Sequence, residues 1–242
     1  MKAIVLTCDR FRAVTDHMTL KYARLWPGHP FRFRVPYQEV ARTIADDRVE
    51  YRKTPSPIKA TVLALLADLD DEELIYWCID DKYPIKLDVP RIEGTLRWLV
   101  GQDPSTISGL LFCRCRKMWD SRFLTGRTLV DDDANVYLER TGYAQIWLHQ
   151  FLRVKVLRHL FEAMPDSIPV PRAMDQLKKR IAKPLSHRVF VGSRNAAVFG
   201  ESTSHGVLTQ NCYRSILENG LAPPSWCSTT TGEEIVMGSL ES

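Results

Sequence analysis

Two adjacent carboxylates, Asp80 and Asp81, directly follow the apolar, aromatic run Leu74–Ile79 and are followed in turn by Lys82. Two carboxylates are costly to hold side by side unless a cation or hydrogen-bond donors compensate for their charge. The pair is therefore a candidate binding site. The alternative is a polar turn, with Pro84 ending the strand, because Asp is common in turns.

The apolar run itself predicts a β-strand, because six apolar residues are too few for a helix of ordinary length. The run lacks polar alternation, which indicates a strand covered on both faces, as in a parallel sheet flanked by helices. The two acids then fall at the carboxyl end of the strand, where open α/β sheets bind their ligands. Position therefore favours a functional site over a simple turn.

The chain before this strand alternates between predicted strands and helices. Strands are predicted at 2–7, 31–35 and 49–52, and helices at 15–25, 38–45 and 58–69. Phe and Arg alternate over 31–35, which predicts a half-exposed or edge strand. The whole order implies βαβ units with right-handed crossovers and a parallel sheet.

The chain after this strand is predicted to be richer in helices. Helices are predicted at 89–100, 143–164, 175–182 and 208–219, and strands at 107–116 and 137–139. The amphipathic pattern over 143–164 predicts the longest helix of the protein. The acidic triplet 131–133 is interpreted as a solvated turn in preference to a metal site, because charge runs usually lie at the surface.

Length and composition set the class of protein. At 242 residues the chain can form one substantial core, so we predict a single domain at 1–222 and a polar C-terminal tail at 223–242. The net charge of +4 favours an anionic substrate such as a nucleotide and does not indicate a nucleic-acid-binding protein. No apolar run reaches the length of a membrane span. Six cysteines without the spacing of a zinc site predict reduced thiols in a cytoplasmic protein.

Three short motifs carry a resemblance to a known family. They are the central motif Ile79–Tyr83, the run Tyr143–Trp147 continued by Phe151–Leu152 and Leu157–Phe161, and the late segment from Phe199 to Leu221. Together with the order of strands and helices, they resemble small bacterial nucleotide-sugar glycosyltransferases of the GT-A type. The resemblance spans most of residues 1–222, and each motif is short and degenerate.

The resemblance implies an α/β, GT-A-like (Rossmann-like) fold with a central mixed, mostly parallel sheet flanked by helices. Residues up to about 100 would bind the donor, and about 101–222 the acceptor. In this family, carboxylates that end the fourth strand hold a divalent metal, Mn²⁺ or Mg²⁺, on the donor diphosphate; Asp80 and Asp81 match that position. A hard cation there neutralises the charge of the departing diphosphate.

The same resemblance and the strand ends suggest roles for further residues. Asp175 lies at about the family's spacing for the base that activates the acceptor, and Asp81 is the second catalytic candidate. Donor contacts are assigned to Thr7, Asp9, Arg10, Lys59, Asp80 and Lys82. Substrate contacts are assigned to Gln145, Trp147 and His205.

The sequence departs from the family pattern at two points. The central motif lacks the Asp-x-Asp form, and Lys82 follows the acids directly, so a lysine beside the diphosphate could partly replace the metal. Asp175 stands where the family has Glu in a Trp-x-x-Glu context. Ordinary alternatives also stay open, namely a capping role for Asp9, core packing for Trp147 and a solvent-exposed position for Lys59.

The function expected is transfer of a sugar from a nucleotide-sugar donor to a glycan or lipid-linked acceptor, with no nucleic-acid partner. The basic cluster 178–180 is either a solvated helix face or a contact with the anionic inner face of the membrane. One alternative is a sugar-phosphate nucleotidyltransferase, which normally needs a glycine-rich loop that Cys8–Arg12 lacks. The other is a non-catalytic protein that binds nucleotide sugars.

Overall fold

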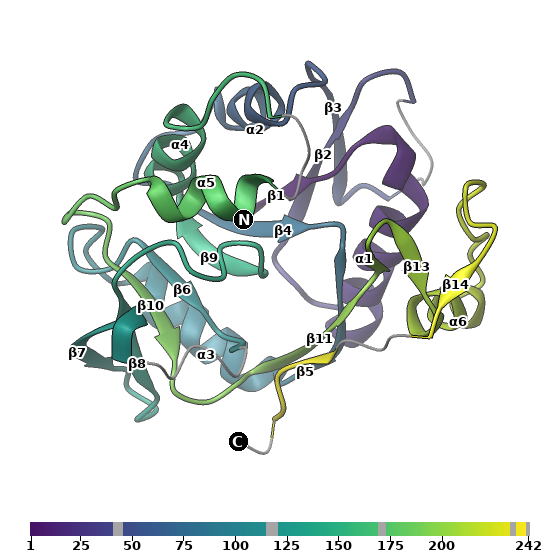
Figure 1. Ribbon diagram of the computed structural model, residues 1–242. Helices are drawn as coiled ribbons and strands as arrows, with labels where there is room; N and C mark the ends of the chain where they lie inside the picture. Colours follow the sequence, from purple (N-terminus) through teal and green to yellow (C-terminus); the bar gives the residue numbers. More distant parts are fainter. Residues whose placement is uncertain (41–45, 115–120, 169–172, 233–235, 241–242) are drawn as a thin grey trace.

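The computed structural model describes residues 1–40, 46–114, 121–168, 173–232 and 236–240. Its centre is a nine-stranded sheet in the order β3-β2-β1-β4-β9-β6-β10-β8-β7 (Figure 1). The strands are β1 (Lys2–Leu6), β2 (Arg32–Tyr37), β3 (Val49–Lys53), β4 (Leu74–Ile79), β6 (Gly109–Leu111), β7 (Leu124–Val130), β8 (Val136–Arg140), β9 (Gln150–Arg153) and β10 (Val189–Gly192).

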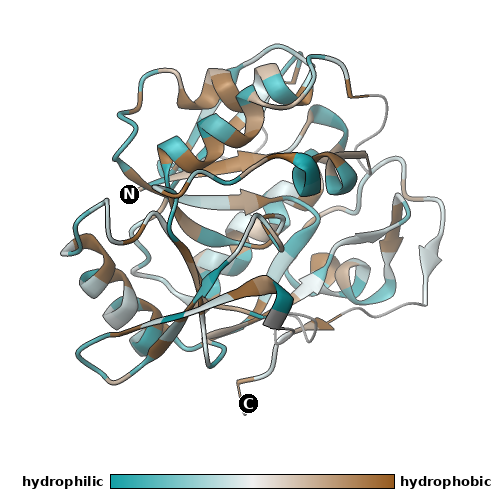
Figure 2. Ribbon diagram, turned by 60° about the vertical axis from the view of Figure 1, so that its left-hand side comes forward, coloured by the Kyte–Doolittle hydropathy of each residue, from teal (hydrophilic) through white to brown (hydrophobic). Residues whose placement is uncertain are grey.

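Helices cover both faces of this sheet. Those on one face are α1 (Arg12–Leu25) and α3 (Val89–Val100), and those on the other are α2 (Ile58–Leu66), α4 (Val154–Glu162) and α5 (Met174–Arg180). Helix α6 (Gln210–Glu218) packs instead on strands of the two smaller sheets. Figure 2 shows apolar residues along the central strands and on the helices that cover them. The predicted α/β fold, with a central mixed sheet flanked by helices, is confirmed. No helix in the described ranges is both long and apolar enough to cross a membrane.

Strand β4 lies between β1 and β9 and is buried on both faces, as predicted. Tyr76 and Cys78 belong to the core under α1 and α3, whereas Ile75 and Trp77 belong to the core under α2 and α4. Successive side chains of a strand point to opposite faces, so a strand between two cores must be apolar throughout. The unbroken apolar run at 74–79 therefore marks the middle of the fold.

The sheet is mixed: its first four strands pair in parallel, and beyond β9 the pair β6 and β10 is also parallel. Strands β3, β2, β1 and β4 run parallel, whereas β9 runs antiparallel to both β4 and β6, and β8 runs antiparallel to both β10 and β7. The description "mostly parallel" thus fits the half before β9. Because β9 is reversed, its first residue lies at the edge where β1 and β4 end, which places the segment 143–149 beside Asp80.

Two three-stranded sheets adjoin the main one, in the orders β15-β11-β5 and β12-β13-β14. Their strands are β5 (Lys82–Leu87), β11 (Ala197–Glu201), β12 (Thr203–Ser204), β13 (Val207–Thr209), β14 (Thr230–Thr231) and β15 (Val236–Met237). Strand β5 begins directly after the two acids and pairs with β11, so that Lys82 faces Glu201. Pro84 lies inside β5, so it does not end the strand pattern as the turn alternative supposed. Within 223–242, β14 and β15 add strands to these sheets.

The predicted long helix at 143–164 is wrong. Residues 143–148 form turns, 150–153 form β9, and only Val154–Glu162 are helical in α4. The helical spacing of the apolar residues is accidental here, because Phe151 and Leu152 are buried between β4 and β6 as strand residues. Tertiary packing has overridden the local pattern.

Smaller differences occur elsewhere in the chain. Strand β2 is neither half-exposed nor at an edge, because β3 pairs beyond it and the buried Arg34 guanidinium lies 2.6 Å from Asp68. Of the strand predicted at 107–116, Gly109–Leu111 form β6, residues 107–108 and 112–114 are not in a strand, and 115–116 lie outside the described residues. Of the helix predicted at 38–45, residues 38–40 are not helical, and 41–45 lie outside the described residues.

Replacing Trp77 by Phe should destabilise the protein by about 2 kcal/mol. Trp77 is fully buried, and its Nε1–H donates to the carbonyl of Ile146 at 2.7 Å. Phenylalanine removes that donor and leaves a void against α4. The urea midpoint should fall, whereas Trp98→Phe, at a partly exposed ring stacked on Tyr137, should change it much less. An unchanged midpoint for Trp77→Phe would contradict the expectation.

Candidate functional site

A cavity of about 740 Å³ lies at the edge of the main sheet where β1 and β4 end and β9 begins. Its size is within the range of roughly 300–1,000 Å³ that is usual for small-molecule sites. Most of the predicted site residues line it, namely Thr7, Asp80, Asp81, Lys82, Gln145, Trp147, Asp175 and His205. Residues that were assigned from strand ends and residues that were assigned from the family resemblance therefore line one cavity.

Lys82 is the best-buried charged group of this cavity, with 6% of its side chain exposed. Its Nζ lies 3.1 Å from Asp81 Oδ2 and 3.2 Å from Glu201 Oε1. Burial alone would lower the pKa of Lys82, but the two carboxylates outweigh burial and raise it. Lys82 therefore stays an ammonium and compensates part of the negative charge of its neighbours.

Asp80 joins β4 to β1 and presents its carboxyl group to the cavity. Its backbone N–H donates to the carbonyl of Leu6 at 3.2 Å. Burial, together with the charge of Asp81, raises the pKa of Asp80 to about 7, although a hydrogen bond with Thr7 and the charge of Lys82 act to lower it. Asp80 is partly exposed and lines the cavity. Near neutral pH this group is thus divided between acid and carboxylate, and a bound cation would favour the carboxylate.

The acidic pair fits a divalent cation only in part. Asp81 Oδ1 is buried and accepts no hydrogen bond from the residues that the structure describes. Across those residues, no group of three His, Cys, Asp or Glu side chains could hold a metal. The protein therefore offers Asp80 and Asp81 without a closed ligand set. This suits an ion such as Mg²⁺, which commonly takes one or two carboxylates and completes its shell with phosphate oxygens and water.

A second charged cluster forms the other wall of the cavity. Asp175 Oδ1 accepts a hydrogen bond from Trp147 Nε1 at 2.8 Å and lies 2.7 Å from Lys178 Nζ. Burial would raise the pKa of Asp175, but the contacts with Lys178 and Trp147 outweigh it and lower the pKa. Asp175 is therefore an ionised carboxylate at neutral pH, held on α5 against the segment that precedes β9.

Three predicted site residues lie elsewhere and have other partners. Asp9 accepts hydrogen bonds from the backbone N–H groups of residues 38–40 at 2.7–3.2 Å, so it holds a distant loop and, contrary to its capping alternative, does not cap α1. The Arg10 guanidinium lies against the rings of Phe11 and Trp226. Lys59 binds the carbonyl of Met164 and Asp166 Oδ1 at 2.9 and 2.7 Å. None of the three lines the cavity.

Glu201 is a cavity residue that strand-end reasoning alone did not assign. It ends β11 and reaches the acidic pair because β11 pairs with β5. A signal existed, since Ala197–Gly200 is a second apolar run that ends in an acid. Met237 also lines the cavity, from β15. No local pattern in the sequence indicates that pairing.

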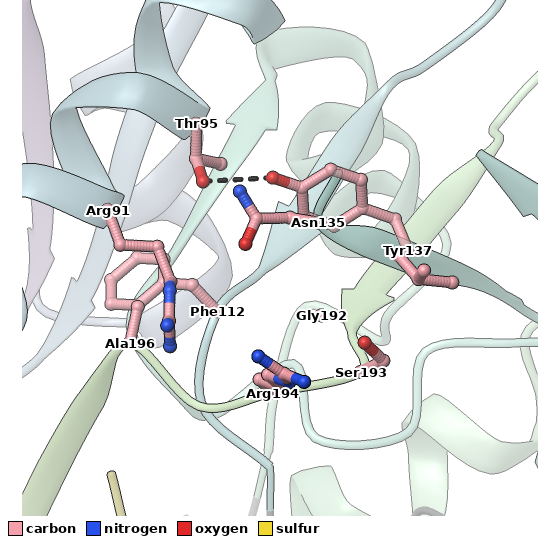
Figure 3. A pocket seen from close by; sticks show the side chains of 10 residues that line it. Arg91, Thr95, Phe112, Asn135, Tyr137, Gly192, Ser193, Arg194 and Ala196 are labelled. Atoms are coloured by element: carbon pink, nitrogen blue, oxygen red, sulfur yellow. Dashed lines mark hydrogen bonds between the residues drawn. The ribbon is translucent and has the colours of Figure 1, made fainter. Parts of the chain in front are cut away.

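A second cavity lies between α3 and the start of β8, lined by Arg91, Thr95, Tyr137 and Arg194 among others (Figure 3). Its volume is about 10 Å³, which is room for a single water molecule at most. The Thr95 hydroxyl and the Tyr137 hydroxyl already bind each other there at 2.9 Å. The larger cavity is therefore the candidate site.

No protein family and no curated protein matches the sequence. Among solved structures, the galactosyltransferase LgtC in complex with donor and acceptor sugar analogues is similar, with a TM-score of 0.43 and 11% identity over 98% of this chain and 86% of that one. An active-site mutant of LgtC is also similar, and this chain spans 66% of the length of that protein.

Two further solved structures, a cytidylyltransferase and a second glycosyltransferase, are similar to a comparable degree. The 2-C-methyl-D-erythritol 4-phosphate cytidylyltransferase IspD of Francisella tularensis has a TM-score of 0.41 and 10% identity over 84% of this chain and 94% of that one. The glycosyltransferase GlyE of Streptococcus pneumoniae has a TM-score of 0.40 and 7% identity over 75% and 44%. The chain is thus similar to glycosyltransferases and to a nucleotidyltransferase. All of these likenesses are too remote to indicate an activity.

Proposed function

We propose that this protein transfers a sugar from a nucleotide-diphosphate donor to a hydroxyl group of a glycan or lipid-linked acceptor, in the cytoplasm or at the inner face of its membrane. One observation carries the proposal. A single cavity joins the acidic end of β4 to a second carboxylate, Asp175, that is held separately beside an indole ring. Such a site can bind a leaving diphosphate at one end and an acceptor at the other.

The order of the strands supports the placement of the donor. Thr7 follows β1, the two acids follow β4, and Trp147 precedes β9, in this sequence along one sheet edge. The nucleoside would lie over the end of β1 and the diphosphate over Asp80 and Asp81, with His205 on the β12–β13 turn also lining the cavity. Residues up to about 100 would thus serve the donor, and later ones mainly the acceptor.

Charge balance supports a cation on the diphosphate. Asp81 and Glu201 are opposed by the single ammonium of Lys82, so a diphosphate alone would meet a net negative surface. Asp80 and Asp81 would hold Mn²⁺ or Mg²⁺, which would neutralise the charge of the leaving group. The Lys82 ammonium lies beside the Asp81 carboxylate and would also neutralise part of the diphosphate charge. Transfer would therefore depend on the ion only in part.

The transfer itself would be a single displacement. The acceptor oxygen bonds to the anomeric carbon, the bond from that carbon to the diphosphate oxygen breaks, and the nucleoside diphosphate leaves with the bonding electrons. Asp175 accepts the proton of the acceptor hydroxyl, and Gln145 and Trp147 position the acceptor. In this role Asp175 needs one oxygen directed to the acceptor. Its two known contacts fall on the other oxygen, Oδ1.

A donor panel tests the proposal. We expect the purified protein to release nucleoside diphosphate from at least one of several UDP-, GDP-, CDP- and dTDP-sugars, faster when a sugar acceptor is present. No release from any donor would overturn it. Release of pyrophosphate from a nucleoside triphosphate with a sugar 1-phosphate would instead indicate a nucleotidyltransferase.

Metal dependence gives a sharper prediction from the same assay. Turnover should rise on addition of Mn²⁺ or Mg²⁺ and should remain measurable in excess chelator, because Lys82 stays charged between the two carboxylates. Complete loss of turnover in chelator would mean that Lys82 does not substitute for the ion. Indifference to metal would remove Asp80 and Asp81 as its ligands.

A further inference from the structure

The segment 143–148 forms one wall of the cavity and has no regular secondary structure. Buried donors nevertheless fix its backbone. The Gln150 amide, itself fully buried, donates to the carbonyls of Gln145, Ile146 and Leu148 at 2.9–3.2 Å, and Trp77 donates to the carbonyl of Ile146. The two N–H groups of this amide are shared among the three carbonyls, so a different course of the turn would leave buried donors and acceptors unsatisfied.

Arg140 also binds this segment and the Gln150 side chain that holds it. It is 1% exposed, and its guanidinium donates to the carbonyl of Ala144 and to Gln150 Oε1, both at 2.8 Å. No ion pair to Arg140 occurs within the described ranges, and burial lowers its pKa to about 10. Gln145 has a positive φ of 60°, a conformation that is strained for a residue other than glycine. The surrounding hydrogen bonds thus stabilise a strained backbone conformation at Gln145, which lies in the cavity wall.

This wall presents the indole of Trp147, which is partly exposed and lines the cavity. Three contacts fix the ring. Its Nε1–H donates to Asp175, the Lys178 ammonium lies 5.2 Å from the ring centroid, and the Phe161 ring packs against it at 6.3 Å in an edge-on arrangement. The same ammonium holds Asp175. The exposed remainder of the indole is therefore presented to the cavity in one orientation.

We propose that Trp147 is a stacking surface for the pyranose ring of the acceptor, and that Asp175 and Lys178 are the residues that position it. An indole provides a flat apolar surface for the C–H face of a sugar, and the adjacent carboxylate can accept a hydrogen bond from a hydroxyl group. In the order of the strands, the acidic pair after β4 lies between this surface and the end of β1. The choice of a sugar as ligand rests on the proposed function.

Because both contacts of Asp175 are made by Oδ1, this side chain can position the indole with one oxygen and bind the acceptor with the other. Oδ1 fixes the indole, and Oδ2 takes no hydrogen bond from the described part of the chain, so it is left for the acceptor hydroxyl. Asn at this position keeps an oxygen that can accept from the indole N–H but cannot take a proton, whereas Ala keeps neither. The pair Asp175→Asn and Asp175→Ala therefore separates positioning from proton transfer.

Saturation-transfer NMR with methyl β-D-glucopyranoside and methyl β-D-galactopyranoside tests the stacking surface without any donor. We expect transfer to the C–H protons of at least one glycoside in the wild type. It should fall roughly fivefold, the scale of a single ring contact, in Trp147→Ala and in Asp175→Ala. It should stay within about twofold of wild type in Asp175→Asn and fall only partly in Trp147→Phe, which keeps an aromatic face. Asp166→Ala, an exposed carboxylate outside the cavity, is the matched control.

Calorimetric titration with UDP, GDP, CDP and dTDP separates this inference from the proposed function. Nucleotide binding without saturation transfer to either glycoside would overturn the stacking surface and leave the donor site standing. Saturation transfer that depends on Trp147 in a protein that binds none of the nucleotides would support the surface and remove the transferase proposal. Wild-type transfer in Asp175→Ala, with unchanged circular dichroism, would show that Asp175 does not position the indole.

Discussion

Asp81→Ala should reduce sugar transfer by roughly 10²–10³-fold, the cost of removing one group that stabilises transition-state charge. In the proposed reaction, negative charge builds up on the diphosphate as the glycosidic bond breaks. In that reaction Asp81 would hold the cation that opposes this charge, and it also pairs with Lys82. The loss should appear in turnover measured at saturating donor, with the best donor found in the panel.

The fold should survive this substitution. The Asp81 side chain is 44% exposed, its Oδ1 has no hydrogen-bond partner among the described residues, and Lys82 keeps Glu201 as a second carboxylate. The Ser202 N–H donates to the backbone carbonyl at this position, so that bond is also kept. Asp166→Ala again serves as the control and should transfer at the wild-type rate. A folded Asp81→Ala protein with wild-type turnover would exclude Asp81 from the site, and an unfolded one would make it structural.

The first half of the fold could be predicted because its strands carry their own signal. In β4, every residue faces one core or the other, so its composition reveals both its burial and its central position. Residues that follow such a strand lie at the sheet edge, so the shared position of Thr7, Asp80 and Asp81 could be predicted, whereas the roles proposed for them came from the family resemblance. The same argument does not apply to Lys59, because a residue on a helix has no fixed position relative to the strand ends. Lys59 lies outside the cavity and binds Asp166.

In the second half, the helices predicted at 89–100, 175–182 and 208–219 match α3, α5 and α6, but the course of residues 143–153 could not be predicted from local pattern. The direction of β9 is set by β4 and β6 on either side of it and by Gln150, whose buried amide binds the preceding turn. In the sequence, the same residues continue the helical spacing of α4. Glu201 reached the site only through pairing with a strand more than a hundred residues earlier. Such contacts form only in the assembled sheet, and neither segment has a sequence pattern that predicts its partner.

Asp175→Asn should reduce turnover by roughly a hundredfold, the low end for the loss of a general base, while donor affinity barely changes. The low end is expected because Lys178 and Trp147 lower the pKa of Asp175, and a carboxylate with a lowered pKa is a weaker proton acceptor. Asn keeps the hydrogen bond to the indole, so the loss should lie in turnover and not in the acceptor KM. Asp175→Ala should impair both.

The matched comparison for this position is Asp131→Asn. Asp131 is likewise a carboxylate that accepts hydrogen bonds, from Asn135 and Tyr137, but it lies in the turn between β7 and β8, outside the cavity. Its substitution should leave turnover unchanged. Turnover near the wild-type rate in Asp175→Asn would exclude Asp175 as the base. The proton would then pass to Glu201 or His205, which also line the cavity, or the reaction would retain anomeric configuration without such a base. Product stereochemistry, read from the anomeric coupling constant by NMR, separates these two outcomes.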